Sequence, residues 1–322
     1  MAGRTDIPAE TGSPARPAGG VARRGGRAPA PVPPREDRPL LAVFLCLGAY
    51  LAFTGIDTSA KWLVTHDIPT AQVVFTRYQV HLVLAVSLAL ATAQPLFASR
   101  ARAQEVLRGA ALLTSTVMNF LALAYLPLAM TSAILFTAPL WICLLSMPLL
   151  GERIGPHRWT ALAAGFAGVL VITRPWTADA HPAMLFSLVA AFTTAIYAII
   201  TRRLAGVDPT STQQVYAAAA AAVGTLPLAL ADWVWPSDLP GWLALGLIGV
   251  FGWGGHQLLT IAHRYAPASA LAPLIYLQIL YMITSGWLVF AQVPDGAVLF
   301  GAAIVVASGI YIWWRERPGR QR

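Results

Sequence analysis

Apolar stretches long enough to cross a membrane follow one another along almost the whole chain after Leu40. A helix needs about 20 apolar residues to span the hydrocarbon core of a bilayer, and only short polar segments separate these stretches. The composition agrees, because 57% of the residues are hydrophobic and only 11% are charged, whereas soluble domains carry about 25% charged residues. The sequence therefore predicts an all-α integral membrane protein.

Apolar runs bounded by Gly, Pro and charged residues predict ten transmembrane helices. The expected helices cover residues 40–63, 69–91, 106–125, 128–149, 158–173, 183–202, 210–231, 241–262, 268–290 and 295–314. Residues 1–38 are rich in Pro, Ala, Gly and Arg and hold almost no large apolar side chains, so we expect a disordered tail. Residues 315–322 are expected to form a second, basic tail.

The Lys and Arg residues gather on one side of the predicted bundle. Nineteen of the 22 lie in the two tails, or in or directly next to every second loop between the predicted helices. Because cytoplasmic loops retain Lys and Arg during insertion, both termini are predicted to be cytoplasmic, in a plasma membrane of the bacterial type. Tails and loops do not form a basic stripe on a folded surface, so a nucleic-acid partner is not expected.

No cofactor or metal is expected either. Cys46 and Cys143 both fall inside predicted spans, and their spacing fits neither a disulfide framework nor a zinc site. The sequence also holds no Walker loop and no nucleophile motif, which argues against ATP-driven pumping and enzymatic chemistry in this chain.

An internal repeat appears when the chain is shifted against itself by 140 residues. Chance matching explains the aliphatic pairs by themselves, but it explains the matches that involve Pro, Thr and Tyr at loop positions less well. Five spans per half is an odd number, so the second half must enter the membrane from the opposite side. The prediction is two inverted five-helix repeats, at 40–175 and 182–314, an arrangement known from alternating-access carriers. The matches at loop positions are Pro69-Thr70 with Pro209-Thr210, Tyr125 with Tyr265, and Pro127 with Pro267.

Several short motifs of the first half resemble the EamA domain of the drug/metabolite transporter superfamily. The motifs are Leu121–Ala129, Thr137-Ala138-Pro139 and Leu150-Gly151-Glu152-Arg153, followed by Trp159, Gly165, Gly168 and Val169. The resemblance covers residues 40–314 as two halves, and the second half departs from it at Ala291-Gln292, where the family often repeats its Gly-Glu pair. It implies ten helices with inward termini and secondary transport of metabolites, amino acids, nucleobase-like compounds or drugs.

Charged residues inside the predicted spans are few. Each needs a reason, because a charge at the bilayer centre costs about 2.5 to 3.5 kcal/mol. Asp57 and Lys61 share a face of the first helix at i, i+4, as do Arg77 and His81 on the second. Asp57 and Arg77 each lie ten residues from Asp67 on antiparallel helices, so we expect them at similar depth and paired.

Two interpretations of these charges stay open. In the first, Asp57 and Arg77 only connect two helices, while Lys61 extends to the outer interface. In the second, Lys61 and Arg77 bind a carboxylate or phosphate of the substrate. His81 is expected near the midplane, where it suits proton coupling, although a membrane histidine is more often a packing residue.

Uncharged polar and aromatic residues complete the predicted substrate site. They are Asn119 on the third span, Trp253 and His256 on the eighth, and Tyr276 and Gln278 on the ninth. The aromatic rings either stack on a planar ligand or fill volume.

The predicted function is therefore secondary active transport, with export as the expected direction. The cargo is a small polar or charged organic metabolite or drug, and a coupling proton is a further partner that the sequence leaves open. Monomer and homodimer also stay open. Two alternatives are an intramembrane lipid-modifying enzyme that uses Asp57 and His81, and a non-transporting membrane sensor or scaffold.

Overall fold

The computed structural model describes residues 38–150, 155–174, 176–177, 181–204, 207–265, 274–275 and 278–316. The regular secondary structure of these residues is helical, as predicted. The α-helices are α1 Pro39–Thr65, α2 Thr70–Ala91, α3 Arg102–Tyr125, α4 Leu128–Leu135, α5 Ala138–Leu150, α6 Pro156–Thr173, α7 Met184–Leu204, α8 Thr210–Ala231, α9 Leu239–Tyr265, α11 Gln278–Phe290 and α12 Gly296–Glu316.

Seven helical segments of the described chain are long and apolar enough to cross a bilayer, judged by length and composition. They are α1, α2, α3, the α4 and α5 segment taken together, α7, α8 and α9. Three shorter apolar helices, at Ala163–Ile172, Gln278–Phe290 and Gly296–Ser308, fall below that length. The expectation of ten spans stays a prediction.

The helix expected at 128–149 is interrupted. α4 ends at Leu135 and α5 begins at Ala138, with Pro139 directly after the break. Proline has no backbone N–H and its ring clashes with the preceding turn of a helix, so an interruption is expected one or two residues before it. The interruption between α4 and α5 therefore agrees with the position of Pro139 as the second residue of α5. Gly151-Glu152-Arg153 lies outside the described residues.

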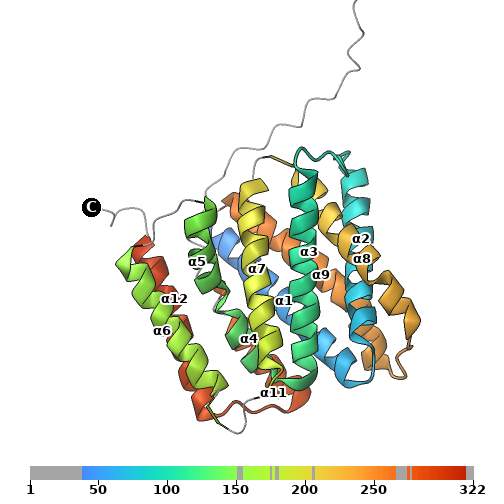
Figure 1. The fold of residues 1–322 in the computed structure, drawn as a ribbon. Helices are drawn as coiled ribbons and strands as arrows, with labels where there is room; N and C mark the ends of the chain where they lie inside the picture. The colour runs from blue at the N-terminus through green and yellow to red at the C-terminus, as the bar shows by residue number, and fades with distance from the viewer. Residues whose placement is uncertain are drawn as a thin grey trace, which may run out of the picture. The chain divides into compact units, whose positions relative to one another are not determined.

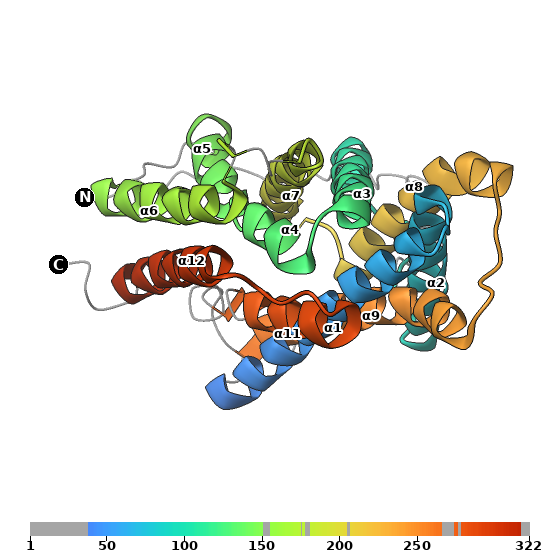
Figure 2. The ribbon, with the colours of Figure 1, turned by 90° about the horizontal axis from the view of Figure 1, so that it is seen from below.

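The helices before residue 174 pack mainly against helices after residue 184. α1 lies along α9, α3 along α7, α2 along α8, and α6 along α12 (Figures 1 and 2). The largest hydrophobic cluster lies between these two parts of the chain and includes Leu63, Tyr78, Phe120 and Ile248. Because the core is shared, neither part buries its apolar residues by itself.

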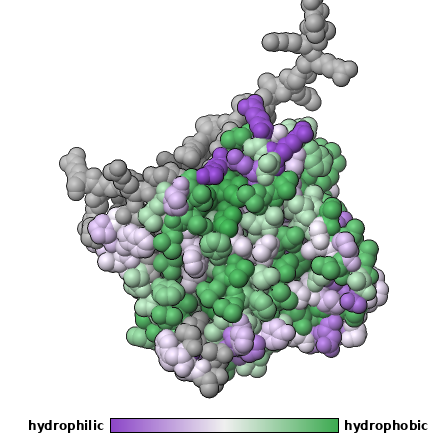
Figure 3. Space-filling view, viewed as in Figure 1, coloured by the Kyte–Doolittle hydropathy of each residue, from purple (hydrophilic) through white to green (hydrophobic). Residues whose placement is uncertain are grey.

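The two ends of the bundle are named here by a residue in their connections. Residues 66–69, 126–127, 232–238 and 291–295 connect helices at the Asp67 end, which is the lower end in Figure 1. Residues 92–101 and 207–209 lie at the Arg100 end. Large apolar side chains are exposed along the helices between the ends, and hydrophilic residues gather at the Arg100 end of the face in Figure 3. An exposed apolar belt of this kind is suited to lipid.

Glycines allow α6 and α12 to approach closely. A Cβ atom placed on Gly301 would lie 2.6 Å from the carbonyl oxygen of Gly168, and one on Gly168 would lie 2.9 Å from the carbonyl oxygen of Gly301. Both contacts are to backbone, which cannot rotate away as a side chain does. Small residues that let backbones meet are typical of helix packing in membranes.

The first prediction concerns this contact. We expect the variant Gly301→Ala to unfold at a lower temperature in detergent, because overpacking costs about 1 to 3 kcal/mol. Gly296→Ala on the same helix is the matched control, since a Cβ atom there meets nothing within 4 Å. Thermal unfolding of both purified variants measures the difference, and equal unfolding temperatures would contradict the close packing of α6 on α12.

Candidate functional site

The third helix connects the two charged residues that the sequence predicts as a pair. Asn119 Nδ2 donates a hydrogen bond of 2.9 Å to Asp57 Oδ1, and Arg77 Nη1 donates one of 2.7 Å to Thr116 Oγ1. Thr116 and Asn119 are three residues apart on α3 and therefore share a face. All four side chains are buried. Asp57 and Arg77 thus lie in one cluster, but the predicted direct ion pair does not form, because side chains of α3 take up both groups.

Aromatic rings surround the Arg77 guanidinium. Its carbon lies 4.8 Å from the ring centre of Tyr78 and 5.8 Å from that of Phe120. The Tyr78 hydroxyl also forms a 2.7 Å hydrogen bond with the Thr116 hydroxyl. Cation–π contacts stabilise a guanidinium that has left water. Sequence reasoning missed Thr116 and Tyr78, although Thr116 lies one helical turn before the predicted Asn119.

Lys61 caps a helix. Its ammonium donates hydrogen bonds of 2.9 Å to the carbonyl oxygen of Leu123 and 2.7 Å to that of Leu126. The last carbonyls of a helix lack partners within it, and Pro127 supplies no N–H group there. A cation at a helix C-terminus is favourable for the same reason. Lys61 is only 4% exposed, so it does not extend to the surface as one interpretation expected. Anion binding by Lys61 stays a prediction.

The two histidines of the predicted site lie near each other. His81 Nε2 forms a 2.9 Å hydrogen bond with Gln214 Oε1 of α8, and the ring centres of His81 and His256 are 5.9 Å apart. The His256 ring also lies 5.1 Å from that of Phe53. Gln214 was missed by sequence reasoning. We call the group of Asp57, Arg77, His81, Thr116, Asn119, Gln214 and His256 the central polar cluster.

Several buried polar atoms here have no hydrogen-bond partner among the described residues. They are Arg77 Nε, His81 Nδ1 and Asn119 Oδ1 of the cluster, together with Trp253 Nε1 on α9. A buried polar group without a partner costs about 1 to 3 kcal/mol. Hydrogen-bonding capacity is therefore left unused at the cluster among the described residues.

The remaining predicted site residues are not brought into the cluster by described contacts. Gln278 begins α11 and is partly buried, and no hydrogen bond of the described residues connects it with the cluster. Tyr276 and Pro273 lie outside the described residues.

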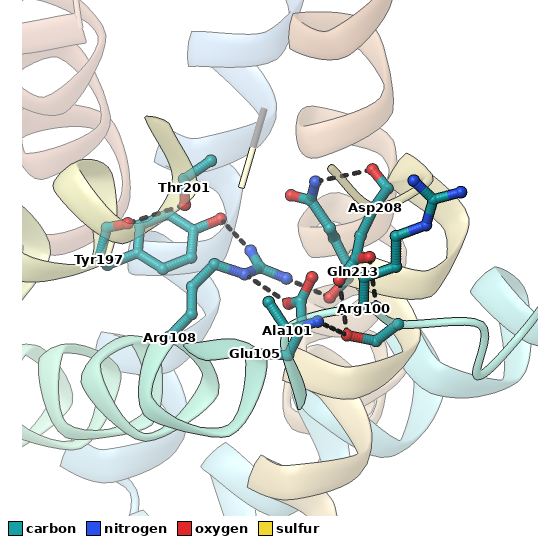
Figure 4. A network of polar contacts seen from close by, with 9 residues as sticks. Arg100, Ala101, Glu105, Arg108, Tyr197, Thr201, Asp208 and Gln213 are labelled. Carbon is teal, nitrogen blue, oxygen red and sulfur yellow. Dashed lines mark hydrogen bonds and ion pairs between the residues drawn. The ribbon is translucent and has the colours of Figure 1, made fainter. Parts of the chain in front are cut away.

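A second polar network joins helices at the Arg100 end (Figure 4). Arg108 Nε forms a buried ion pair of 3.0 Å with Glu105 Oε2. The same guanidinium donates a 3.3 Å hydrogen bond to the Tyr197 hydroxyl of α7 and another to the Gln213 carbonyl oxygen of α8. Sequence reasoning treated Arg108 only as a topology signal. The structure makes it a tie between α3 and the later helices.

Asp208 extends this network into the connections. Its carboxylate accepts hydrogen bonds of 2.6 Å from Ser99 Oγ and 2.8 Å from the backbone N–H of Arg100. Burial opposes ionisation of Asp208, but these hydrogen bonds outweigh it and lower the pKa of the carboxyl group. The α2–α3 and α7–α8 connections are therefore held together by a charged acceptor.

A pocket opens at the Asp67 end between α4, α11 and α12. Its lining includes Pro127, Met130, Met282, Gly286, Gln292 and Asp295. Gln292, which stands at the position of the family's Glu, accepts a long hydrogen bond of 3.4 Å from the Leu128 N–H. Arg174 forms an ion pair with Asp295 and, after the Val298 N–H, contributes to lowering the pKa of that carboxyl group.

An apolar helical bundle that encloses a buried polar cluster defines a class of protein, the polytopic membrane proteins that handle small solutes. A model of the EamA-like transporter family matches residues 40–174 and, a second time, residues 181–314. The chain therefore belongs to the EamA-like transporter family, and the resemblance read from its motifs is confirmed.

Individual relatives are also named as transporters. A riboflavin transporter of Vibrio cholerae is 31% identical over 89% of this chain and 98% of its own length. An S-adenosylmethionine uptake transporter of Rickettsia felis is 28% identical over 67% of this chain and 74% of its own. A pseudopaline exporter of Pseudomonas aeruginosa is 28% identical over 83% and 94%. These names support a multi-pass membrane transporter of small metabolites and set the enzyme alternative aside.

The fold is similar to that of a protein of known crystal structure. The TM-score is 0.64 at 20% sequence identity, and the match covers 85% of this chain and 96% of the other. At this identity the likeness shows the fold alone.

The second prediction tests the ion pair at the Arg100 end. Arg108→Gln leaves the buried Glu105 carboxylate without its counter-charge, which for a buried pair costs about 3 to 5 kcal/mol. We expect a lower unfolding temperature for this variant, measured in detergent. The double variant Glu105→Gln/Arg108→Gln should recover most of the loss, because neither member of the pair is then left as a buried charge without its partner. A double variant as unstable as the single one would contradict a buried, paired Glu105.

Proposed function

We propose that this chain moves a small polar organic metabolite across the membrane by alternating access, with the central polar cluster as its substrate site. The observation that carries the proposal is the set of buried, unpartnered polar atoms where α2 packs against α3 and α9. In a bundle surrounded by lipid, polar groups of this kind are typical of a substrate path.

The packing of the helices supports ten spans in two inverted repeats. Exchange of the halves carries α1 onto α7, α2 onto α8, α3 onto α9 and α6 onto α12. α1 packs against α9, and their counterparts α7 and α3 also pack against each other. α2 packs against α9, and their counterparts α8 and α3 do so too. In two further packed pairs, α2 with α8 and α6 with α12, the two helices are counterparts of each other. A pseudo-two-fold axis between the halves predicts this pattern, and the two family matches agree with it.

Two hydrogen bonds at opposite ends of the bundle give the same support. The shift of 140 residues carries Gln72 onto Thr212, and Gln94 onto Val234. Gln72 Nε2 donates a 2.6 Å hydrogen bond to the carbonyl oxygen of Val234. Thr212 Oγ1 donates one of 3.1 Å to the carbonyl oxygen of Pro95. Pro95 lies one residue after the counterpart of Val234, so corresponding segments of the two repeats contact each other at the Asp67 end and at the Arg100 end.

The two ends differ in what closes them. At the Arg100 end, Arg108 and Asp208 connect the first half to the second through charged groups. At the Asp67 end, a pocket lies between α4, α11 and α12. In the proposed mechanism the network of Arg108 and Asp208 breaks when the Arg100 end opens and forms again when the Asp67 end opens.

The relatives suggest the first solutes to test. The riboflavin transporter matches over almost its whole length, so riboflavin is the first probe, and S-adenosylmethionine is the second. Relatives named for uptake and for export both occur, so the expectation of export stays a prediction that a directional assay decides.

The third prediction is the transport experiment. Purified protein in liposomes should give saturable flux of one of these probes above protein-free liposomes, followed by riboflavin fluorescence or by radiolabel. Arg77→Ala should lower that flux at least about tenfold, because the only guanidinium of the cluster is lost. Arg100→Ala is the matched control, since it keeps the backbone N–H that Asp208 uses. A folded protein that moves neither probe in either direction would contradict the proposal.

The fourth prediction is the orientation, which places the Arg100 end and both termini in the cytoplasm. The test uses single cysteines at the exposed Gln104 and Ser237 in a background with Cys46→Ala and Cys143→Ala. A membrane-impermeant maleimide should label Ser237→Cys in intact cells and Gln104→Cys only after lysis. The reverse pattern would mean that Lys and Arg do not set the orientation of this chain.

A further inference from the structure

One glycine of α9 faces the two unpartnered nitrogen atoms of α2. A Cβ atom placed on Gly252 would lie 3.5 Å from Arg77 Nε and 3.9 Å from His81 Nδ1. Both side chains are more than nine-tenths buried, with exposures of 6% and 4%, and both atoms lack a hydrogen-bond partner among the described residues. We call the space between these three residues the Gly252 notch.

Helix packing explains Gly249 and Gly255 of α9 but not Gly252. A Cβ atom on Gly249 would lie 2.9 Å from the carbonyl oxygen of Arg77, and one on Gly255 would lie 2.6 Å from Phe53 Cε1. Those positions need glycine for α9 to lie against α2 and α1. At Gly252 an alanine methyl group would make only ordinary van der Waals contacts. The absence of a side chain at Gly252 is therefore not required by packing.

The two nitrogen atoms at the notch have opposite hydrogen-bonding roles. An amide oxygen only accepts, so the hydrogen bond of His81 Nε2 with Gln214 Oε1 requires the proton on Nε2. In the neutral ring, Nδ1 then carries the lone pair and accepts. Arg77 Nε always carries a proton and donates, while its Nη1 is already bonded to Thr116 and Tyr78. One donor and one acceptor thus lie beside the same glycine.

We propose that the Gly252 notch binds an amide or imide edge of the substrate, in which a carbonyl oxygen accepts from Arg77 Nε and the adjacent N–H donates to His81 Nδ1. This inference rests on the proposed function and names the substrate class for the same site. A carboxylate fits less well, because one of its oxygen atoms would face the lone pair of Nδ1. The class is that of neutral heterocycles with a –CO–NH– edge, to which the pyrimidinedione ring of riboflavin belongs.

The test compares two alanine variants of α9. Gly252→Ala fills the notch, whereas Gly254→Ala on the same helix places a methyl group where nothing lies within 4 Å. We expect Gly252→Ala to raise the KM for riboflavin flux at least about tenfold, because a buried donor and acceptor lose their partners. Gly254→Ala should leave the KM unchanged. Neither variant should unfold at a lower temperature than wild type, since alanine favours helix.

A chemical probe tests the same bond from the ligand side. Riboflavin methylated at N3 keeps both carbonyl oxygens and lacks the N–H group. We expect wild-type protein to bind it at least about tenfold more weakly than riboflavin, and Gly252→Ala to bind the two compounds equally.

The outcomes separate the two proposals. Wild-type protein without flux of any probe would overturn the proposed function. Wild-type flux of riboflavin that Gly252→Ala and N3 methylation leave unchanged would overturn only the notch. Wild-type flux of S-adenosylmethionine but not of riboflavin would overturn the imide edge and keep transport.

Discussion

Polar side chains inside a lipid-surrounded bundle must find their partners within the protein, and this requirement organises the interior described here. Lys61 meets it by binding the free carbonyls at the end of α3. Glu105 and Arg108 meet it by pairing with each other. At Arg77 and His81 the requirement is met only in part. One oxygen of Glu105 also lacks a hydrogen-bond partner among the described residues, so incomplete bonding alone does not set Arg77 and His81 apart. They differ in that two unpartnered nitrogen atoms lie beside the same glycine of α9.

The helix contacts that build the core also connect the two halves of the chain. α9 lies against α1 and α2 through glycines at positions 249 and 255, so its distance from them is fixed by backbone contact. The notch at Gly252 lies between these two contacts. A substrate bound there would touch helices of both halves at once, which is the geometry that couples binding to a relative movement of the halves.

Hydropathy predicted the helices well because a lipid-spanning helix is encoded in its own residues. The helix expected at 210–231 begins and ends as predicted, and the break before Pro139 follows from local sterics. The partners of the charged residues were harder to predict, since they come from other helices. The similar depth of Asp57 on α1 and Arg77 on α2 predicted that the two residues lie near each other. Their partners Asn119 and Thr116 could not be predicted, because which residues of α3 face the pair depends on the rotation of α3 about its own axis. His81 bonds to Gln214, far along the chain, and no local pattern shows that contact.

The contacts that close the two ends are related but unequal in strength. Gln72 with Val234, and Thr212 with Pro95, are neutral hydrogen bonds between corresponding segments of the two repeats. The Arg100 end adds the buried charged groups Arg108 and Asp208, whereas the ion pair of Arg174 with Asp295 at the Asp67 end is open to solvent. Hydrogen bonds to buried charged groups contribute about 1.5 to 3 kcal/mol, against about 1 for neutral ones and about 0 to 1 for exposed ion pairs. If the halves exchange shapes during transport, opening the Arg100 end costs more than opening the Asp67 end. The resting carrier would then favour access from the Asp67 end, and substrate binding must supply the difference.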